Sequence, residues 1–570
     1  MVYTKSIYES VEPIPDQNIH DFLFNSPVQP PIDDWTLYID AVTGVKTSRS
    51  EFIERVRDGT TALGSWTSVG GLGLAPSGEM VGILGHNCMN FSAVLHSLLA
   101  LTVPFALPSA FSTPFELAHA LRTAKCTRLF VQEALLPGAL QAAKEVGLPD
   151  DRIYILEGRV PGRKSFDDMI QTVRKRKVPR IAAQPANRNT LAYLVFSSGT
   201  SGLPKAVMIS HGNVISIYRQ GEVSASVEPV PPPGSPLPMV LAFLPFYHSY
   251  ALQLVCMRGI REPATFVVLP TWNLDLVVKV VPKYKINALQ LIPSAVHQLL
   301  HSPKVKSEDF DSVVRISCGA AHLPMELKKK LLTVIKNCPL IGEGFGMSEC
   351  TVSAMRKPSP LAFDGKLSIP LEAVGILLPG QESRIVKEDG SEAGYNEPGE
   401  LWVRGPNVAL GYFSNEKATK ETFLPDGWLR TGDTFTMDER GNFFFVDRAK
   451  DTLKISGAQV SPAEIEAVLT AHPGGLIIDV SVAGVSGGRT SDELVPRAWV
   501  VLSEKGKQLG EAAVVKELRG WSEKNLSKYK WLRGGIGIVD EIPKNPTGKV
   551  LRRLLQERYE QSLREPKAKL

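Results

Sequence analysis

The residues whose types and spacing point most clearly to chemistry lie in one short stretch, in which Ser197-Ser198-Gly199-Thr200-Ser201-Gly202 is followed by Lys205. Four hydroxyl-bearing residues and two glycines can form a loop whose N–H groups point the same way, and Lys205 adds a positive charge. A polyphosphate is the ligand that such a loop suits. The stretch lacks the GxxxxGK[ST] pattern of a Walker A loop, and Gly71-Leu72-Gly73 lacks the third glycine of a Rossmann fingerprint. By itself, such a stretch is usually an ordinary turn.

Further segments rich in glycine and polar residues follow it along the chain. They are Gly319-Ala320-Ala321, Gly344-Phe345-Gly346-Met347-Ser348-Glu349, Gly399–Pro406, Asp426–Asp433, Asp447-Arg448, Lys454–Val460 and Pro543–Lys549. Glu349 is a single carboxylate beside a hydroxyl, and Mg²⁺ typically takes one or two carboxylates together with phosphate oxygens. Asp433 carries two acceptors suited to a ribose diol. Lys549 lies in a loop rich in proline, asparagine and glycine, from which a flexible amine could reach a site on another domain.

Taken in this order, the segments resemble the adenylate-forming superfamily, which includes acyl-CoA synthetases, 4-coumarate-CoA ligases, firefly luciferase and peptide-synthetase adenylation domains. The chain looks most similar to the 4-coumarate-CoA ligase-like acyl-CoA ligases, and the resemblance extends from about Ser48 to Leu551. So many separate motifs in one order make it specific. It implies an acid-thiol ligase that uses ATP, Mg²⁺ and CoA. The carboxylic acid first becomes an acyl-adenylate, with release of pyrophosphate, and the acyl group then passes to the thiol of CoA.

The resemblance implies a role for each motif in the first step. The loop from Ser197 to Lys205 would hold the β- and γ-phosphates, Ser348 the α-phosphate, and Glu349 the magnesium ion. Phe345 would stack on the adenine. The implied catalytic residues are Lys549, Thr200, His248 and Glu349. The implied ATP and AMP site comprises Ser197, Ser198, Gly199, Thr200, Ser201, Gly202, Lys205, Gly319, Ala320, Ala321, Glu343, Gly344, Phe345, Gly346, Ser348, Asp433, Arg448 and Lys549.

The second step and the acid also have implied residues. In the family the small domain rotates after adenylation, and Lys450 matches its hinge residue. The implied CoA site is Lys454, Ser456, Gly457 and Gln459, and the implied acyl pocket is His248, Tyr250, Leu254, Val296, Gly346 and Cys350. These side chains indicate an apolar acid, with aryl, arylalkanoic and medium-chain fatty acids left open. The alternatives are transfer to a carrier-protein thiol, a luciferase-like oxidation, and a non-catalytic nucleotide-binding homologue.

The elements that must position these residues alternate in type. Short apolar runs such as MVGILG and TLAYLVF are each followed by helical patterns, which indicates an α/β fold with a largely parallel sheet. By resemblance, a large α/β domain with two packed sheets and a small β-barrel-like part precedes a small mobile α+β domain. The pattern changes near Asp447–Lys450, so we place an N-terminal ATP- and acyl-binding domain at 1–449 and a C-terminal lid domain at 450–570.

The composition of the 570 residues narrows the class of protein further. A net charge of +5 is too small over this length to indicate a nucleic-acid partner. Six scattered cysteines indicate reduced thiols inside a cell. The uncharged stretch 87–115 contains prolines, and we expect a buried helix and a strand there rather than a membrane span. The tail Ala568-Lys569-Leu570 is a close variant of Ser-Lys-Leu, which predicts a peroxisomal import receptor as a partner and the peroxisome, otherwise the cytoplasm, as the location.

Overall fold

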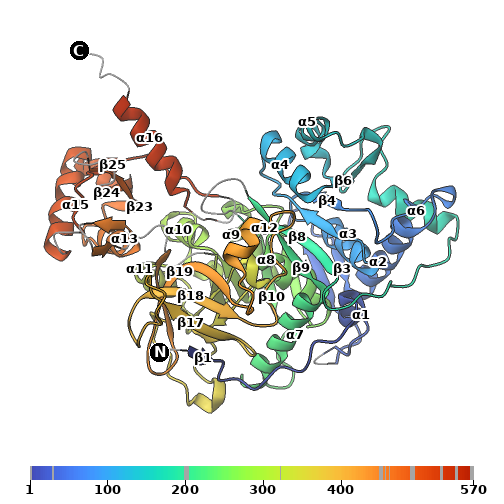
Figure 1. Ribbon diagram of the computed structural model, residues 1–570, viewed down its shortest axis with the longest axis horizontal. Helices are drawn as coiled ribbons and strands as arrows, with labels where there is room; N and C mark the ends of the chain where they lie inside the picture. Colours follow the sequence, from blue (N-terminus) through green and yellow to red (C-terminus); the bar gives the residue numbers. More distant parts are fainter. Residues whose placement is uncertain are drawn as a thin grey trace.

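The computed structural model consists of a large body and a smaller C-terminal lobe (Figure 1). It describes residues 3–28, 31–197, 204–320, 323–448, 453–455, 458–460, 462–487, 494–526, 530–545, 548 and 550–564. The body holds sheets of nine, six and five strands, and the lobe holds sheets of three and two. This confirms the predicted α/β class, with a large N-terminal part and a smaller C-terminal part.

The nine-stranded sheet is the largest and carries much of the candidate site. Its strands from β14 to β2 are mutually parallel, and the antiparallel strands β15, β16 and β3 extend its two edges. In spatial order the strands are β16 (Ile376–Leu377), β15 (Met355–Arg356), β14 (Ile341–Phe345), β13 (Arg315–Cys318), β12 (Ala288–Leu291), β10 (Met239–Ala242), β11 (Thr265–Val268), β2 (Thr36–Asp40) and β3 (Lys46–Ser48).

The six-stranded sheet is parallel except for its last strand. β8 and β9 pair in an antiparallel hairpin, and they carry the two ends of the predicted phosphate loop, Ser197 and Lys205. The strands in order are β7 (Ile153–Ile155), β6 (Arg128–Val131), β4 (Val81–Leu84), β5 (Phe105–Leu107), β8 (Leu191–Ser197) and β9 (Lys205–Ser210).

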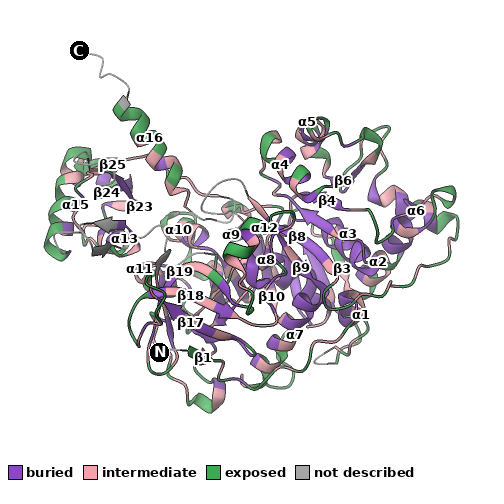
Figure 2. Ribbon diagram, in the orientation of Figure 1, coloured by how far each residue is buried: buried purple, intermediate pink, exposed green. Residues whose placement is uncertain are grey.

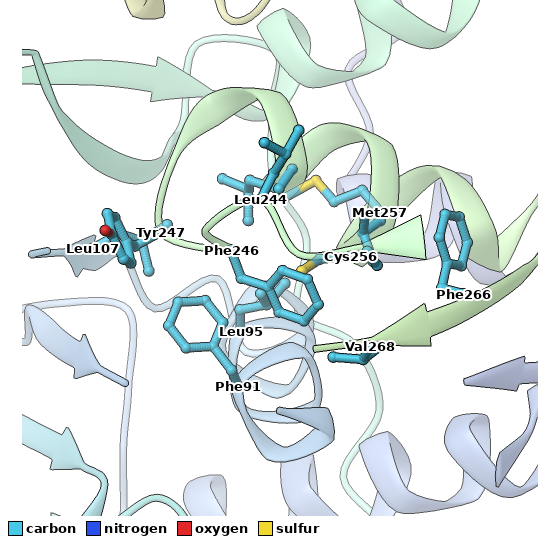
Figure 3. Packing of buried hydrophobic residues seen from close by; sticks show 14 of the residues in the cluster. Phe91, Leu95, Leu107, Leu244, Phe246, Tyr247, Cys256, Met257, Phe266 and Val268 are labelled. Carbon is cyan, nitrogen blue, oxygen red and sulfur yellow. The ribbon is translucent and has the colours of Figure 1, made fainter. Parts of the chain in front are cut away.

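One continuous hydrophobic core joins these two sheets. The helix α3 (Met89–Ala100) lies within it and is buried at every residue after Met89. Figure 3 shows Phe91 and Leu95 of this helix packed near Phe246 and Cys256 from the nine-stranded half of the body. The uncharged stretch thus forms the expected buried helix and strand, and no helix among the described residues is long and apolar enough to cross a membrane.

The five-stranded sheet is antiparallel throughout and has its own hydrophobic cluster. Its strands are β1 (Tyr3–Lys5), β17 (Glu382–Val386), β18 (Gly399–Arg404), β19 (Leu429–Met437) and β20 (Phe443–Arg448). The backbone of Asp433 in β19 is in register with that of Arg448 in β20, so this sheet brings two predicted ribose ligands to neighbouring positions.

The C-terminal lobe is built around two small hydrophobic clusters of its own. Its predicted helix–strand–strand–helix order is observed. The elements are β21 (Leu453–Ile455), β22 (Ala458–Val460), α13 (Pro462–Thr470), β23 (Ile477–Ser486), β24 (Leu494–Leu502), α14 (Glu504–Leu509), α15 (Glu511–Asn525), β25 (Ile536–Ile538) and α16 (Arg552–Arg564). The domain boundary predicted at residue 450 lies outside the described residues.

Helices cover both faces of the body's large sheets, and the burial pattern in Figure 2 places the core between them. Capping side chains determine where several of these helices begin. Ser48, Thr113 and Ser165 each start a capping box, in which the cap side chain and the acidic side chain three residues later satisfy each other's backbone N–H groups. The remaining helices of the body are α1 (Ile19–Phe24), α2 (Arg49–Gly64), α4 (Pro114–Ala124), α5 (Leu136–Val146), α6 (Phe166–Lys175), α7 (His211–Ser226), α8 (Ser249–Ala251), α9 (Leu274–Tyr284), α10 (Pro293–His301), α11 (Met325–Val334) and α12 (Glu416–Thr422).

Buried histidines make the stability of the body depend on pH. Burial lowers the pKa of His96 to about 4, while its Nε2–H donates to the carbonyl oxygen of Cys256 over 2.7 Å. The unfolded chain binds a proton at this residue from about pH 6.5 downward, whereas the folded protein does not. The free energy of unfolding should therefore keep its full value above about pH 6.5. Between pH 6.5 and pH 4 each such histidine should lower it by up to about 1.4 kcal/mol per pH unit.

We expect His96→Gln, which offers an amide donor but does not titrate, to reduce the pH dependence of the unfolding free energy by the contribution of one histidine. Urea unfolding at pH 7, 6 and 5 measures it. An unchanged slope in the variant would show that the acid sensitivity arises elsewhere.

Candidate active site

A cavity of about 2310 Å³ lies where the body meets the lobe. It opens at the carboxyl ends of β12, β13 and β14, the edge at which open parallel sheets usually bind their ligands. Residues from the β8–β9 hairpin, the five-stranded sheet and the lobe complete its lining. The predicted site residues that line it are Ser197, Lys205, His248, Tyr250, Leu254, Gly319, Ala320, Glu343, Gly344, Phe345, Gly346, Ser348, Glu349 and Asp433.

The phosphate side of the cavity is tied to the predicted magnesium ligand through a tyrosine. The Nζ atom of Lys205 lies 4.8 Å from the ring centroid of Tyr412. The hydroxyl of Tyr412 donates to Oε1 of Glu349 over 2.8 Å, and Glu349 is only 2% exposed. Among the described residues no lysine or arginine forms an ion pair with Glu349. A buried carboxylate without a basic partner is a poor structural element but a good ligand for a divalent cation.

The backbone around Glu349 is constrained by close packing. A Cβ atom at Gly346 would lie 1.8 Å from the carbonyl oxygen of Val352, so only glycine fits there. Thr351 has φ +64°, a strained conformation for a β-branched residue, and its hydroxyl donates to the carbonyl of Asn407. The hydroxyl of Ser249 lies 3.3 Å from that of Ser348. The loop thus holds its hydroxyl and carboxylate in one arrangement before any ligand binds.

The nucleotide side is formed by the ends of β13 and β14 together with β19. Phe345 makes an edge-to-face contact with Phe435, with ring centroids 4.9 Å apart. Ala320 has φ +69°, so the chain turns sharply as it leaves β13. Phe345, Gly319 and Asp433 line the same cavity, as an adenosine site requires.

Glu343 is part of a buried charge cluster that the motifs do not reveal. Nζ of Lys328 lies 2.6 Å from its carboxylate, and Nζ of Lys357 lies 3.8 Å from it. Burial raises the pKa of Glu343, while Lys328 opposes the shift. Burial also lowers the pKa of Lys357 to about 8. The two lysines together compensate the carboxylate beneath the nucleotide side of the cavity.

The predicted acyl residues divide into two groups. His248, Tyr250, Leu254 and Gly346 line the cavity, and burial lowers the pKa of His248 to about 4, which keeps its imidazole neutral at pH 7. Val296 and Cys350 instead lie in two hydrophobic clusters and do not line this cavity. Val296 faces the core because α10 is amphipathic, whereas Ser294 and His297 of that helix face the lobe.

The lobe contributes its own wall and touches α10. Lys544, Asn545, Gly548 and Val550 line the cavity, so both neighbours of Lys549 do so. A Cβ atom at Gly548 would lie 2.8 Å from Oγ of Ser294. One turn further along α10, Nε2 of His297 bonds to the carbonyl oxygen of Ile478 in β23. Next to that carbonyl, Asp479 pairs with Lys544 at 2.5 Å.

Several predicted site residues lie outside the described residues. They are Ser198, Gly199, Thr200, Ser201, Gly202, Ala321, Lys450, Ser456, Gly457 and Lys549. Arg448, Lys454 and Gln459 are described through their backbones: Arg448 lies in β20, and Lys454 of β21 is in register with Gln459 of β22. Their roles therefore stay predictions. Tyr412, Lys328 and Lys357 were not predicted, because no motif links residues that meet only in the folded chain.

Comparison with known proteins agrees with this arrangement. The AMP-binding enzyme family matches residues 68–413, and the AMP-binding enzyme C-terminal domain matches residues 464–549. A probable 4-coumarate–CoA ligase 1 from Dictyostelium discoideum is 32% identical, over 84% of this chain and 86% of that protein. The acyl-CoA ligase AFT1-1 from Alternaria alternata is 31% identical, over 92% and 90%.

Solved structures share the fold. The anthranilate CoA ligase AuaEII in complex with anthranoyl-AMP has a TM-score of 0.81 at 22% identity, covering 97% of this chain and 99% of that one. ATP-bound MatB from Rhodopseudomonas palustris has a TM-score of 0.79 at 24% identity, covering 96% and 99%. The family match over more than half of the chain, supported by relatives above 30% identity, shows that this protein belongs to the AMP-binding, adenylate-forming enzymes.

Proposed function

We propose that this protein is an ATP-dependent acyl-CoA ligase, which converts a carboxylic acid, ATP and CoA into acyl-CoA, AMP and pyrophosphate through an acyl-adenylate. One observation carries the proposal. A single cavity is lined by the flanks of the phosphate loop, by the nucleotide and acyl residues, and by both neighbours of Lys549. The 4-coumarate–CoA ligase and acyl-CoA ligase relatives support the same reaction.

In the first step the protein must bring two anions together, the acid's carboxylate and the α-phosphate of ATP. Lys205 and the loop before it would hold the outer phosphates, and Ser348 would donate to the α-phosphate. Lys549 would place a positive charge between the carboxylate and the phosphate, where negative charge develops. Preorganised charges of this kind lower a barrier by a few kcal/mol.

We further propose that Glu349 binds Mg²⁺. Its buried carboxylate has no ion-pair partner among the described residues, and Tyr412 fixes one of its oxygens, leaving the other for a metal. A bound Mg²⁺ would neutralise charge on the triphosphate and on the departing pyrophosphate. For the second step, the backbone around Gly457, flanked by Lys454 and Gln459, would admit the pantetheine arm of CoA, with Lys450 as the hinge.

Two assays test the function. Acid-dependent exchange of labelled pyrophosphate into ATP should occur without CoA, and a CoA thioester should form when CoA is added. Exchange without a thioester would instead favour transfer to a carrier-protein thiol or a luciferase-like oxidation. Absence of both with a broad panel of aryl and aliphatic acids would leave only a non-catalytic nucleotide-binding protein.

We also propose that the tail Ala568-Lys569-Leu570 directs the protein to peroxisomes through their import receptor. A fluorescent protein fused to the N-terminus of the full chain should accumulate in peroxisomes. Deletion of the three tail residues should leave the fusion in the cytoplasm, while Lys567→Ala, just before them, should not. Peroxisomal accumulation of the truncated fusion would refute the assignment.

A further inference from the structure

The cavity continues well beyond the residues that would hold the acid's carboxylate. Along β12, β13 and β14 it is lined not only at the carboxyl ends of the strands but also by Ala288, Arg315 and Leu340, which lie at their amino ends. From Gly344 back to Leu340 the strand covers about 13 Å, at about 3.3 Å per residue. The lining of the cavity therefore includes residues at both ends of these strands.

Strand register shows that one face of the sheet forms the floor of this channel. Gln290 is in register with Ser317, and Ser317 with Gly342, so these three residues form one row. Residues opposite each other in a sheet project from the same face. Ala288 lies two residues before Gln290 on β12 and so projects from the same face. It is in register with Val240 of β10 on one side and with Arg315 of β13 on the other. Because Gly342, Ser317 and Ala288 are small, the floor stays open where large side chains would fill it.

The opposite wall is formed by Tyr250 and by the segment that follows it. Tyr250 lies over Gly319, where an added Cβ atom would be 3.2 Å from its ring. Leu252–Met257 forms a π-helix, a rare conformation that often occurs at functional sites, and Leu254 within it lines the channel. Two of its backbone carbonyls accept hydrogen bonds from residues outside the π-helix. The hydroxyl of Tyr38 donates to the carbonyl of Val255, and the ring of His96 donates to that of Cys256.

A hydrogen bond between Tyr250 and Gln290 crosses the cavity. The hydroxyl of Tyr250 donates to Oε1 of Gln290 over 2.7 Å. On the nucleotide side of this pair lie Gly319, Gly344 and Ser348; on the far side lie Ala288, Val240 and Phe266. A compact ring would end at Tyr250. Only an extended chain would use the space beyond.

We infer that the acid is an extended aliphatic chain, whose distal part passes the Tyr250–Gln290 pair and lies on the small-residue floor formed by Gly342 and Ala288. This inference rests on the proposed ligase function and names its substrate class. The far end of the channel reaches the sheet edge beside the exposed Arg315, so it sets no sharp upper limit on chain length. Val240, Ala264, Phe266 and Ala288 give an apolar lining of the kind that an alkyl chain requires, and the charged Arg258 and Glu262, which also line the cavity, pair with each other.

The test compares kcat/KM for thioester formation from dodecanoate, hexanoate, benzoate and 4-coumarate. The unmodified enzyme should favour dodecanoate over both aryl acids by at least tenfold. Ala288→Leu fills the floor beyond the pair and should lower the dodecanoate-to-hexanoate ratio at least tenfold. Gln290→Ala removes the crossing hydrogen bond and should raise that ratio severalfold. Ala182→Leu, the same substitution at an exposed position outside the site, should leave the ratio unchanged.

Two variants with opposite expected effects keep the test decisive if one of them fails to fold. A preference for benzoate or 4-coumarate over dodecanoate would overturn the inference and leave the ligase function intact. An Ala288→Leu or Gln290→Ala variant with an unaltered ratio would also overturn it. Failure of every acid to support pyrophosphate exchange would instead refute the proposed function itself.

Discussion

Lys549→Ala should reduce acid-dependent pyrophosphate exchange by a factor of about 100 to 1,000, the effect of removing one preorganised charge contact from a transition state. Both neighbours of Lys549 line the cavity that also holds Ser348 and Glu349, which supports the proposal that its amine acts in the adenylation step. In contrast, thioester formation from a supplied acyl-adenylate should largely survive, because the two anions have already been joined by then.

The matched control is Lys505→Ala, which removes the same charge from an exposed position in α14 of the same lobe. Both half-reactions should proceed normally in that variant. An equal loss of both half-reactions in Lys549→Ala would contradict the proposed division between the steps. A fully active Lys549→Ala enzyme would remove this residue from the chemistry altogether.

The second large effect is expected from Glu349→Gln, which keeps an acceptor for Tyr412 but removes the negative charge. We expect the rate of adenylation at saturating ATP to fall at least 100-fold, since the substitution removes the carboxylate that would bind Mg²⁺. The Mg²⁺ concentration that gives half-maximal rate should rise as well, and a titration of the exchange reaction with Mg²⁺ measures both quantities.

Tyr412→Phe serves as the control for this prediction. It removes only the hydrogen bond to Oε1 and leaves in place the negative charge that would bind Mg²⁺. Its effect on the rate should therefore be smaller than that of Glu349→Gln, and the Mg²⁺ concentration that gives half-maximal rate should change less. If the Gln variant keeps an ordinary rate and an unchanged Mg²⁺ requirement, Glu349 is not the metal ligand.

Much of the fold could be predicted because its signals are local. The alternation of short apolar runs with amphipathic segments predicted a parallel α/β architecture, and α3 and β5 appear where the uncharged stretch was assigned a helix and a strand. The lobe's elements follow the predicted order for the same reason. Hydrophobic periodicity depends on neighbours within a turn or two, which a sequence displays directly.

The site was predictable only in part. Glycine and hydroxyl motifs indicated Ser197, Lys205, Phe345, Ser348 and Asp433, all of which line the cavity. Tyr412 carries no motif, yet it connects Lys205 with Glu349. Val296 has the apolar character expected of an acyl pocket, but the rotation of α10 turns it into the core. The face that a helical residue presents depends on what packs against the helix.

The amino-acid sequence by itself determined the class of chemistry, because binding a triphosphate and activating a carboxylate require particular side chains, and these recur in a recognisable order. Only the tertiary structure decided the extent of the cavity and the partners of buried charges. Those properties depend on pairs such as Tyr250 with Gln290 and Lys328 with Glu343, which are 40 and 15 residues apart in the chain. Sheet register and helix packing bring such pairs together, and neither is visible in the spacing of residues along the chain.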